Sequence, residues 1–165
     1  MYEFSKSGGV IVSSYLVDVL DRKEVRLVGF SIVESLNKMM ETKVGGKLRK
    51  ELERRQSEVA NRAGSGMYLI QIYPQDGQWT PDVPYRHIFA YEVGAFAQIP
   101  ADMVSYTLPA GRFIKVVHKG AESQIGDTYD FINQTYGVRP IDIEYWSDIH
   151  TLENEDNQID IYVPR

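Results

Sequence analysis

The chain has 165 residues, of which 43% are hydrophobic and 25% charged, the composition of one globular domain with a hydrophobic core. It contains no cysteine, which excludes disulfides, thiolate metal sites and cysteine nucleophiles. The formal net charge of −5 argues against a nucleic-acid binder, because such a protein needs a basic face to neutralise phosphates.

The first predicted element is an extra N-terminal strand over residues 10–20. This apolar run contains Asp18, is too short to span a membrane and has no signal-peptide pattern around it. We therefore expect a cytoplasmic protein without a membrane partner. Residues 24–35 are rich in β-branched side chains and predict the next strand, in which Gly29 marks a bulge or the close approach of another backbone.

A helical pattern follows over residues 37–62. Apolar residues fall near helical spacing there, and Asn37 is the expected N-cap of the helix. The adjacent Gly45 and Gly46 are expected to break or kink its first turns, because glycine is a poor helix former.

The rest of the chain repeats the order of strands, helix and strands. Strands are predicted at 67–74, 87–96, 103–107, 113–118, 141–148 and 159–164, and a second helix at 123–138 with a stripe of Ile125, Tyr129, Ile132 and Tyr136. A Leu-Pro-Ala-Gly corner at 108–111 separates two of these strands. Helices on one face of a mostly antiparallel sheet make an α+β fold.

The sequence offers little for nucleophilic or metal-dependent catalysis. The chain has no GxSxG motif, and His87, His118 and His150 are too widely spaced to form a recognised metal-binding motif. A structural place at a strand end or on the surface is the simpler interpretation for each histidine. We therefore expect no cofactor and no metal ion.

Carboxylates on strands are the remaining chemical feature. In "IDIEYWSD" (141–148), the two-residue period puts Asp142, Glu144 and Trp146 on one face and the isoleucines with Tyr145 on the other. We expect the isoleucine face to meet a helix. The face with Glu144 then meets either solvent, which the pattern alone favours, or a groove where a carboxylate and aromatic rings recognise a cation.

Several segments together resemble one family pattern. "LPAGRFIKVVHKGAESQIGDTYDFI" (108–132) has a Pro-Ala-Gly corner, a strand that begins with an aromatic residue and ends in His-x-Gly, and a helix with Thr-Tyr near its middle. "RPIDIEYWSD" resembles the family's strand with a single glutamate, "IDIYVPR" its closing strand, and "FAYEVGAF" and "RLVGFSIVES" two earlier strands. In this order they resemble the GyrI-like, or AraC-type effector-binding, domain, which is also the drug-binding half of some multidrug-sensing transcription regulators.

The resemblance covers residues 24–165 and leaves residues 1–23 as an N-terminal extension. It implies two pseudo-symmetric strand–helix–strand halves, with two helices on one face of the sheet and a concave groove on the other. The family's groove glutamate, which faces lipophilic cations, matches Glu144. The aromatic candidates for the groove are Trp146, Phe113, Tyr91, Tyr68 and Phe30.

The resemblance implies a stand-alone module that binds amphipathic, cationic small molecules. The chain shows no helix-turn-helix segment, so we expect neither a complete transcription regulator nor direct binding to nucleic acid. Lys115 shares a face with Phe113, and an ion pair with Glu144 would weaken a cation site. Two alternatives stay open: a gyrase-inhibitor-like protein-interaction module, and a hydrolase of electrophilic small molecules in which Glu144 activates water beside Tyr145 or Trp146.

Overall fold

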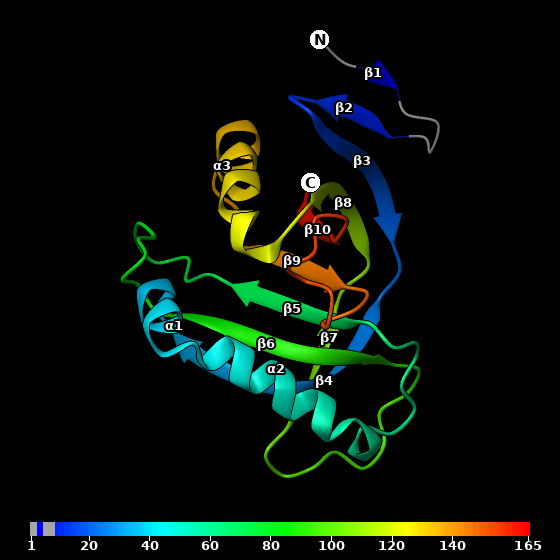
Figure 1. Cartoon of the computed structure of the whole chain (residues 1–165). Coiled ribbons are helices and arrows are strands. Elements are labelled where there is room, and N and C mark those ends of the chain that lie inside the picture. The colour runs from blue at the N-terminus through cyan, green and yellow to red at the C-terminus, as the bar shows by residue number, and fades with distance from the viewer. Residues whose placement is uncertain (1–2, 5–8) are drawn as a thin grey trace.

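The computed structural model describes residues 3–4 and 9–165, and within them ten strands form one antiparallel sheet that carries three α-helices (Figure 1). The strands are β1 (Glu3–Phe4), β2 (Val10–Val12), β3 (Tyr15–Arg22), β4 (Val25–Glu34), β5 (Met67–Ile72), β6 (Tyr85–Val93), β7 (Val104–Leu108), β8 (Gly111–Lys119), β9 (Ile141–Trp146) and β10 (Gln158–Pro164). The helices are α1 (Leu36–Thr42), α2 (Val44–Arg54) and α3 (Ile125–Tyr136), with two short 3-10 helices, η1 (Gln56–Glu58) and η2 (Glu122–Gln124).

The sheet consists of two similar halves that meet at its centre. The strand order is β1-β2-β3-β8-β10-β9-β5-β6-β4-β7. The first half runs β4, α1 and α2, β5, β6, and the second runs β8, α3, β9, β10. β9 pairs with β5 at the centre of the sheet. From there outward the order is β5, β6, β4 in the first half and β9, β10, β8 in the second, so in each half the last strand in the chain lies between the other two. This confirms the predicted α+β fold with two pseudo-symmetric halves.

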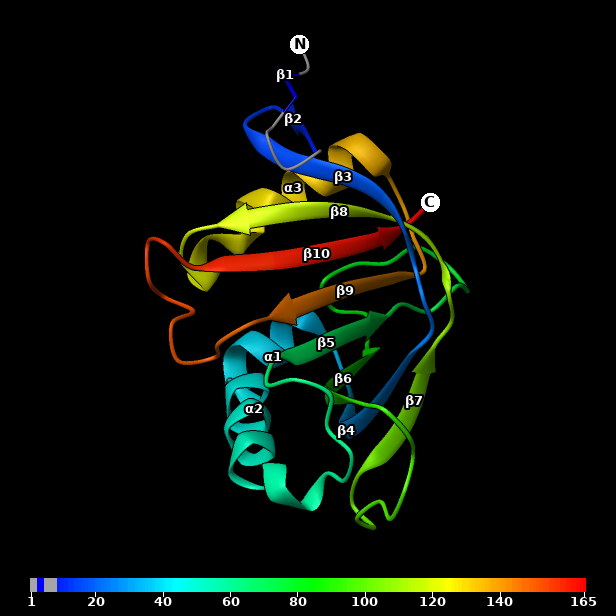
Figure 2. The ribbon, with the colours of Figure 1, turned by 90° about the vertical axis from the view of Figure 1, so that its right-hand side faces the viewer.

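The strand that precedes each half in the chain, β3 or β7, pairs with a strand of the other half. The chain passes from β3 to β4 and from β7 to β8 with short links, yet β3 pairs with β8 and β4 pairs with β7. The two ladders almost join, since one ends at Arg22 opposite Gly111 and the other begins at Val25 opposite Leu108. Figure 2 shows β3 running down into β4 beside β7, which runs up into β8. The predicted Leu-Pro-Ala-Gly corner is the second of these links.

All three helices lie over the same face of the sheet, which we call the helix face (Figure 1). Leu52 of α2 and Ile132 of α3 are fully buried in one core with strand residues of that face, such as Phe89 and Ile161. A second core fills the opposite face, where Ile70 and other strand residues pack near the β7–β8 link. The sheet is therefore apolar on both sides.

The first helical segment differs in detail from its prediction. Residues 37–62 form α1, α2 and η1 rather than one helix, and the break lies at Lys43, which has a left-handed backbone with φ 56°. Gly45 and Gly46 both lie inside α2. The N-cap is Ser35 rather than Asn37, and its side chain accepts a hydrogen bond from the Lys38 amide.

The N-terminal region adds an edge to the second half. Residues 10–20, expected as one strand, belong to the two strands β2 and β3, with Ser13 and Ser14 at positive φ in the turn between them. Residues 1–2 and 5–8 of the proposed extension lie outside the described part, and the boundary at residue 23 stays a prediction. In the described part, no helix combines the length and the apolar character needed to cross a bilayer.

Candidate functional site

Glu144 lies on the helix face of β9. Trp146, two residues further along, belongs to the core beneath the helices, and the Tyr129 hydroxyl of α3 reaches Glu144. The prediction that the isoleucine face of this strand meets a helix is wrong, because Ile143 packs in the core of the opposite face. Glu144 therefore does not face the helix-free side, where the family resemblance placed the groove.

Three neutral donors hold the Glu144 carboxylate, which is 5% exposed. The Tyr129 hydroxyl donates to Oε2 at 2.6 Å, and the Trp146 indole N–H donates to Oε1 at 3.0 Å. The Gln71 amide nitrogen lies 3.3 Å from Oε2 and 2.9 Å from the Tyr129 hydroxyl. Among the described residues, no lysine, arginine or histidine forms an ion pair with Glu144.

The surroundings of Glu144 change its acidity. Burial raises the pKa of Glu144 to about 7, although the hydrogen bonds from Tyr129 and Trp146 act in the opposite direction. Burial also raises the pKa of Tyr129 well above its usual value, and the nearby Glu144 charge adds to this effect. Tyr129 therefore stays protonated, and Glu144 titrates near neutral pH.

Asp142, the next carboxylate on the same face, is compensated in full. Arg139 pairs with both of its oxygens, and the Tyr73 hydroxyl donates to it at 2.7 Å. The Arg139 side chain is itself well buried beside the carboxylate. Asp142 is thus half of an internal ion pair, whereas Glu144 has no such partner among the described residues.

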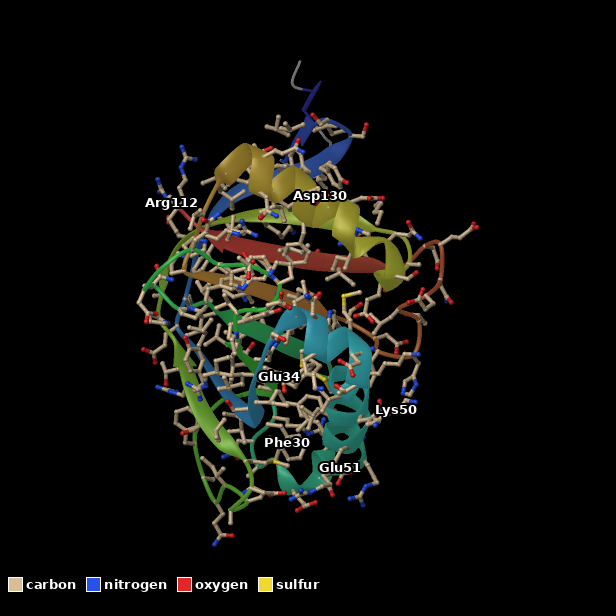
Figure 3. The ribbon with its side chains drawn as sticks, turned by 90° about the vertical axis from the view of Figure 1, so that its left-hand side faces the viewer. Phe30, Glu34, Lys50, Glu51, Arg112 and Asp130 are labelled. Atoms are coloured by element: carbon tan, nitrogen blue, oxygen red, sulfur yellow. The ribbon has the colours of Figure 1, made fainter. Side chains whose placement is uncertain are left out.

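Aromatic rings surround the two carboxylates. Phe89 lies 6.1 Å from Trp146 between ring centroids, on one side of Glu144. Tyr73, Trp79, Tyr85 and His87 form a second aromatic group, with neighbouring ring centroids 3.9 to 6.1 Å apart. Burial raises the pKa of Tyr85, and the Glu144 charge raises it further, so this group lies within electrostatic reach of the carboxylate. Figure 3 shows the helix face, with β9 and β10 in view between α3 and the α1–α2 pair.

The six predicted site residues divide between the two faces of the sheet. Glu144, Trp146, Tyr91 and Phe30 lie on the helix face, whereas Tyr68 and Phe113 pack in the core of the opposite face. The structure therefore does not bring Tyr68 or Phe113 to Glu144. The sequence predicts all six residues in one groove, but the sheet separates Tyr68 and Phe113 from the other four.

Phe30 and Tyr91 lie farther along the helix face and each has an arginine over its ring. Arg55 lies 5.6 Å from the Phe30 ring centroid, and Arg62 lies 5.3 Å from that of Tyr91. Tyr91 also lines a cavity of about 290 Å³ between α2 and the loop after β9, together with Met67, the cross-strand neighbour of Trp146. Through Met67, the lining of this cavity lies next to the Trp146 end of β9.

Lys115 cannot neutralise Glu144. It lies opposite Asp18 and Tyr162 in the ladders of β8, on the face of the sheet that Phe113 occupies. An ion pair between Lys115 and Glu144 is therefore excluded, because the two side chains lie on opposite faces of the sheet. Tyr145, one of the two suggested catalytic partners, also lies on the opposite face, where its ring contacts Tyr68.

Tyr129 and Gln71 are the site residues that sequence reasoning missed. Tyr129 stands in the predicted apolar stripe of the second helix, and Gln71 is the polar residue in an otherwise apolar strand. A hydroxyl within an apolar helix stripe and an amide within an apolar strand are signals that buried partners exist.

His118 lies at the end of β8, and both of its ring nitrogens have hydrogen-bond partners. His118 is buried between the Thr128 hydroxyl at 2.6 Å and the Ala121 carbonyl at 2.9 Å, which confirms its expected structural place at the end of β8. Among the described residues, no three acidic or histidine side chains are grouped as metal ligands.

The sequence matches one known protein family over most of its length. The family described as Cass2, integron-associated effector binding protein, matches residues 19–164. The chain belongs to this Cass2 family. Among curated proteins, none matches the sequence.

Solved structures show the same fold as this Cass2 family member. SAV2435 bound to tetraphenylphosphonium is 16% identical with a TM-score of 0.67, and the match covers 90% of this chain and 92% of that one. The integron cassette protein VCH_CASS2 of Vibrio cholerae is 13% identical with a TM-score of 0.62, over 90% and 94% of the two chains. EcmrR in its complex with DNA is 14% identical with a TM-score of 0.66, and this chain, 93% of which is matched, spans 58% of it. These likenesses support the effector-binding, GyrI-like fold.

Proposed function

We propose that this protein binds lipophilic cations and that Glu144 supplies the counter-charge. The observation that carries the proposal is a buried carboxylate that accepts hydrogen bonds from neutral groups and has no cationic partner among the described residues. Membership of an effector-binding family supports small-molecule binding as the class of function.

The physical argument is one of desolvation. Burying a carboxylate without a counter-ion is unfavourable, so a cation that reaches Glu144 gains an interaction that the free protein leaves unmade. A small ion loses much of its hydration on entry, whereas a bulky cation with delocalised charge loses less and gains contact with rings such as Trp146 and Phe89. Tetraphenylphosphonium, to which SAV2435 is bound, is a cation of this kind.

Calorimetric titration with two ions of equal shape tests the proposal. Tetraphenylphosphonium is expected to bind, and tetraphenylborate, the matching anion, to bind weakly or not at all. Glu144→Gln should weaken tetraphenylphosphonium binding about 10- to 150-fold, because a charge-assisted contact contributes about 1.5–3 kcal/mol. Glu51→Gln, which removes an exposed charge from α2, is the matched control and should leave the affinity unchanged. Equal affinity for both ions, or no effect of Glu144→Gln, would refute the proposal.

The pH dependence provides an independent signature. Cation binding requires the ionised carboxylate, and burial raises the pKa of Glu144 to about 7. The affinity for tetraphenylphosphonium should therefore rise by up to about tenfold per pH unit below pH 7 and level off above it, and the total rise should not exceed the about 10- to 150-fold effect of Glu144→Gln. Glu144→Gln should remove this dependence. A wild-type affinity that stays constant from pH 5 to pH 8 would contradict the role given to Glu144.

A hydrolase remains the second candidate, for one specific reason. A carboxyl group with a pKa of about 7 and a tyrosine hydroxyl 2.6 Å away is an arrangement that suits general acid–base catalysis. A hydrolase from Listeria innocua has the same fold, at 8% identity and a TM-score of 0.52 over 90% of each chain. Incubation with epoxides or aziridines, followed by mass spectrometry, decides between the two: ring-opened product formed by wild type and not by Tyr129→Phe or Glu144→Gln would favour the hydrolase.

A further inference from the structure

Arg49 of α2 places a cation on the ring that supports Glu144. Its guanidinium carbon lies 4.7 Å from the centroid of the Trp146 indole, within the range of a cation–π contact. The same indole donates its N–H to Glu144 at 3.0 Å. Trp146 thus has Arg49 over its ring and Glu144 at its edge.

Glu122 of η2 holds Arg49 in this position. Two guanidinium nitrogens donate to the two Glu122 oxygens at 2.8 and 3.0 Å, which is the paired geometry that gives arginine–carboxylate contacts their strength. Both side chains are mostly buried, at 19% and 25% exposed. Because α2 belongs to the first half and η2 precedes α3 in the second, this pair links the helical segments of the two halves near Trp146.

The pair also keeps Arg49 from neutralising Glu144. Glu122 takes two of the guanidinium donors, and Arg49 forms no ion pair with Glu144 in the described structure. Five other arginine–aromatic contacts occur among the described residues, but none of their rings is hydrogen-bonded to Glu144. Of the described arginines, only Arg49 both contacts the Trp146 ring and pairs with a carboxylate of the other half.

Building on the proposed function, we infer that Arg49 is an internal competitor that sets which cations the site accepts. A ligand that is to place its charge over Trp146 must displace the guanidinium, and Arg49 can leave the ring only when its contact with Glu122 rearranges. A small, strongly hydrated ammonium gains too little from the ring to do this. A large aromatic cation covers more of the ring and loses less hydration, so the site selects bulky, delocalised cations.

The first test measures competition with defined ions. Arg49→Ala clears the ring, and removal of the competing contact should tighten tetraphenylphosphonium binding about 5- to 20-fold by calorimetry. Tetramethylammonium, too weak to displace Arg49 in wild type, should then bind measurably. Because Arg49→Ala also frees the Glu122 charge, the double variant Arg49→Ala/Glu122→Gln must retain most of the gain. Arg86→Met removes an arginine over Tyr106, away from Glu144, and serves as the matched control with unchanged affinity.

The second test needs no drug-like ligand. In a Trp79→Phe background Trp146 is the sole tryptophan of the chain, so its fluorescence reports on its own ring. Added ethylguanidinium should give a saturable change in emission with Arg49→Ala and none with the parent that retains Arg49. Arg49→Lys, which keeps a cation on the same helix position, should respond weakly.

The two hypotheses fail in different ways. If Glu144→Gln weakens tetraphenylphosphonium binding but Arg49→Ala leaves it unchanged or weaker, the inference on Arg49 is overturned and the proposed function stands. If tetraphenylphosphonium binds to none of the proteins, the proposed function fails. The ethylguanidinium titration still decides whether the Trp146 ring is a cation subsite that Arg49 occupies. If the Arg49→Ala variant gives no fluorescence response, the inference on Arg49 is overturned.

Discussion

Two carboxylates on β9 have opposite electrostatic surroundings although they share one face. Asp142 is completely buried and pairs with Arg139, so its charge is compensated within the protein. Within the described part of the chain, Glu144 accepts hydrogen bonds from neutral groups only, those of Tyr129, Trp146 and Gln71. An uncompensated buried charge lowers the stability of the folded state.

The free energy of unfolding should therefore depend on Glu144 and pH together. The pKa of Glu144 is about 7 in the folded protein and 4.5 as its ordinary value, so its stabilising contribution is complete below pH 4.5 and is lost as the pH rises through 7. Glu144→Gln carries no such loss. We expect its stability relative to wild type to rise with pH, by about 3 kcal/mol between pH 4.5 and pH 7.5.

Urea denaturation of the two proteins at intervals of one pH unit measures this difference. Asp142→Asn is the contrasting control: it leaves the buried Arg139 unpaired and should destabilise the protein at neutral pH, by about 3–5 kcal/mol. Parallel stability curves for wild type and Glu144→Gln would show that Glu144 does not titrate near neutral pH.

At the scale of elements, local sequence patterns predict most strands and helices but not which face of the sheet the helices cover. Alternation along residues 141–148 predicts the strand and sorts its side chains, since that depends on backbone geometry alone. Which face the helices cover depends on how the two halves assemble. For the same reason Tyr129 and Gln71, which are 15 and 73 residues from Glu144 in sequence, could not be assigned to it.

The helix break shows a second limit of local patterns. Two adjacent glycines indicate an interruption, yet Gly45 and Gly46 are helical and the chain turns at Lys43. A propensity ranks residues by their average cost in a helix, and packing of α2 on the sheet outweighs that cost here. Gly29, by contrast, is predicted to mark either a bulge or a close approach of backbones, and the structure shows the close approach, between β4 and β6.

The two kinds of glycine should respond oppositely to alanine. A Cβ at Gly29 would lie 1.8 Å from the Phe89 carbonyl oxygen, and backbone cannot move aside within a sheet, so Gly29→Ala should cost about 3 kcal/mol or more. A Cβ at Gly46 meets no atom within 4 Å, and Gly46→Ala should stabilise the protein by about 0.5–1 kcal/mol. Chemical denaturation of both variants measures this, and a stable Gly29→Ala variant would contradict the close approach.

At the scale of the whole molecule, the exchanged strands bind the halves into one unit. β3 lies at the edge of the second half, where its ladder runs from Leu16 opposite Val117 to Arg22 opposite Gly111. β7 in turn covers the edge of the first half by pairing with β4. Each half therefore needs one strand from the other part of the chain to complete its sheet. The second half needs β3, which directly precedes β4, and the first half needs β7, which directly precedes β8.

Two truncations should separate the contributions of the N-terminal strands. Deletion of residues 1–14 removes β1 and β2, which in the described structure pair only with each other and with β3, and the melting temperature should change little. Deletion of residues 1–23 also removes β3, exposing β8 as an edge strand and uncovering part of both cores. We expect the shorter protein to melt well below the full chain and to aggregate, by circular dichroism and size-exclusion chromatography. A monomeric 24–165 fragment with unchanged melting would show that β3 is dispensable.

The exchange of strands also has a consequence during protein synthesis. Asp21 on β3 and its partner Arg112 on β8 are 91 residues apart, so β3 leaves the ribosome long before the strand that it pairs with. At about 5–20 residues per second, this interval lasts on the order of 5–20 s. Until then β3 has β2 beside it on one side, and its other edge, which later pairs with β8, has no partner. Chaperones that hold nascent chains are therefore expected to engage it, and its sheet closes only after most of the chain has been made.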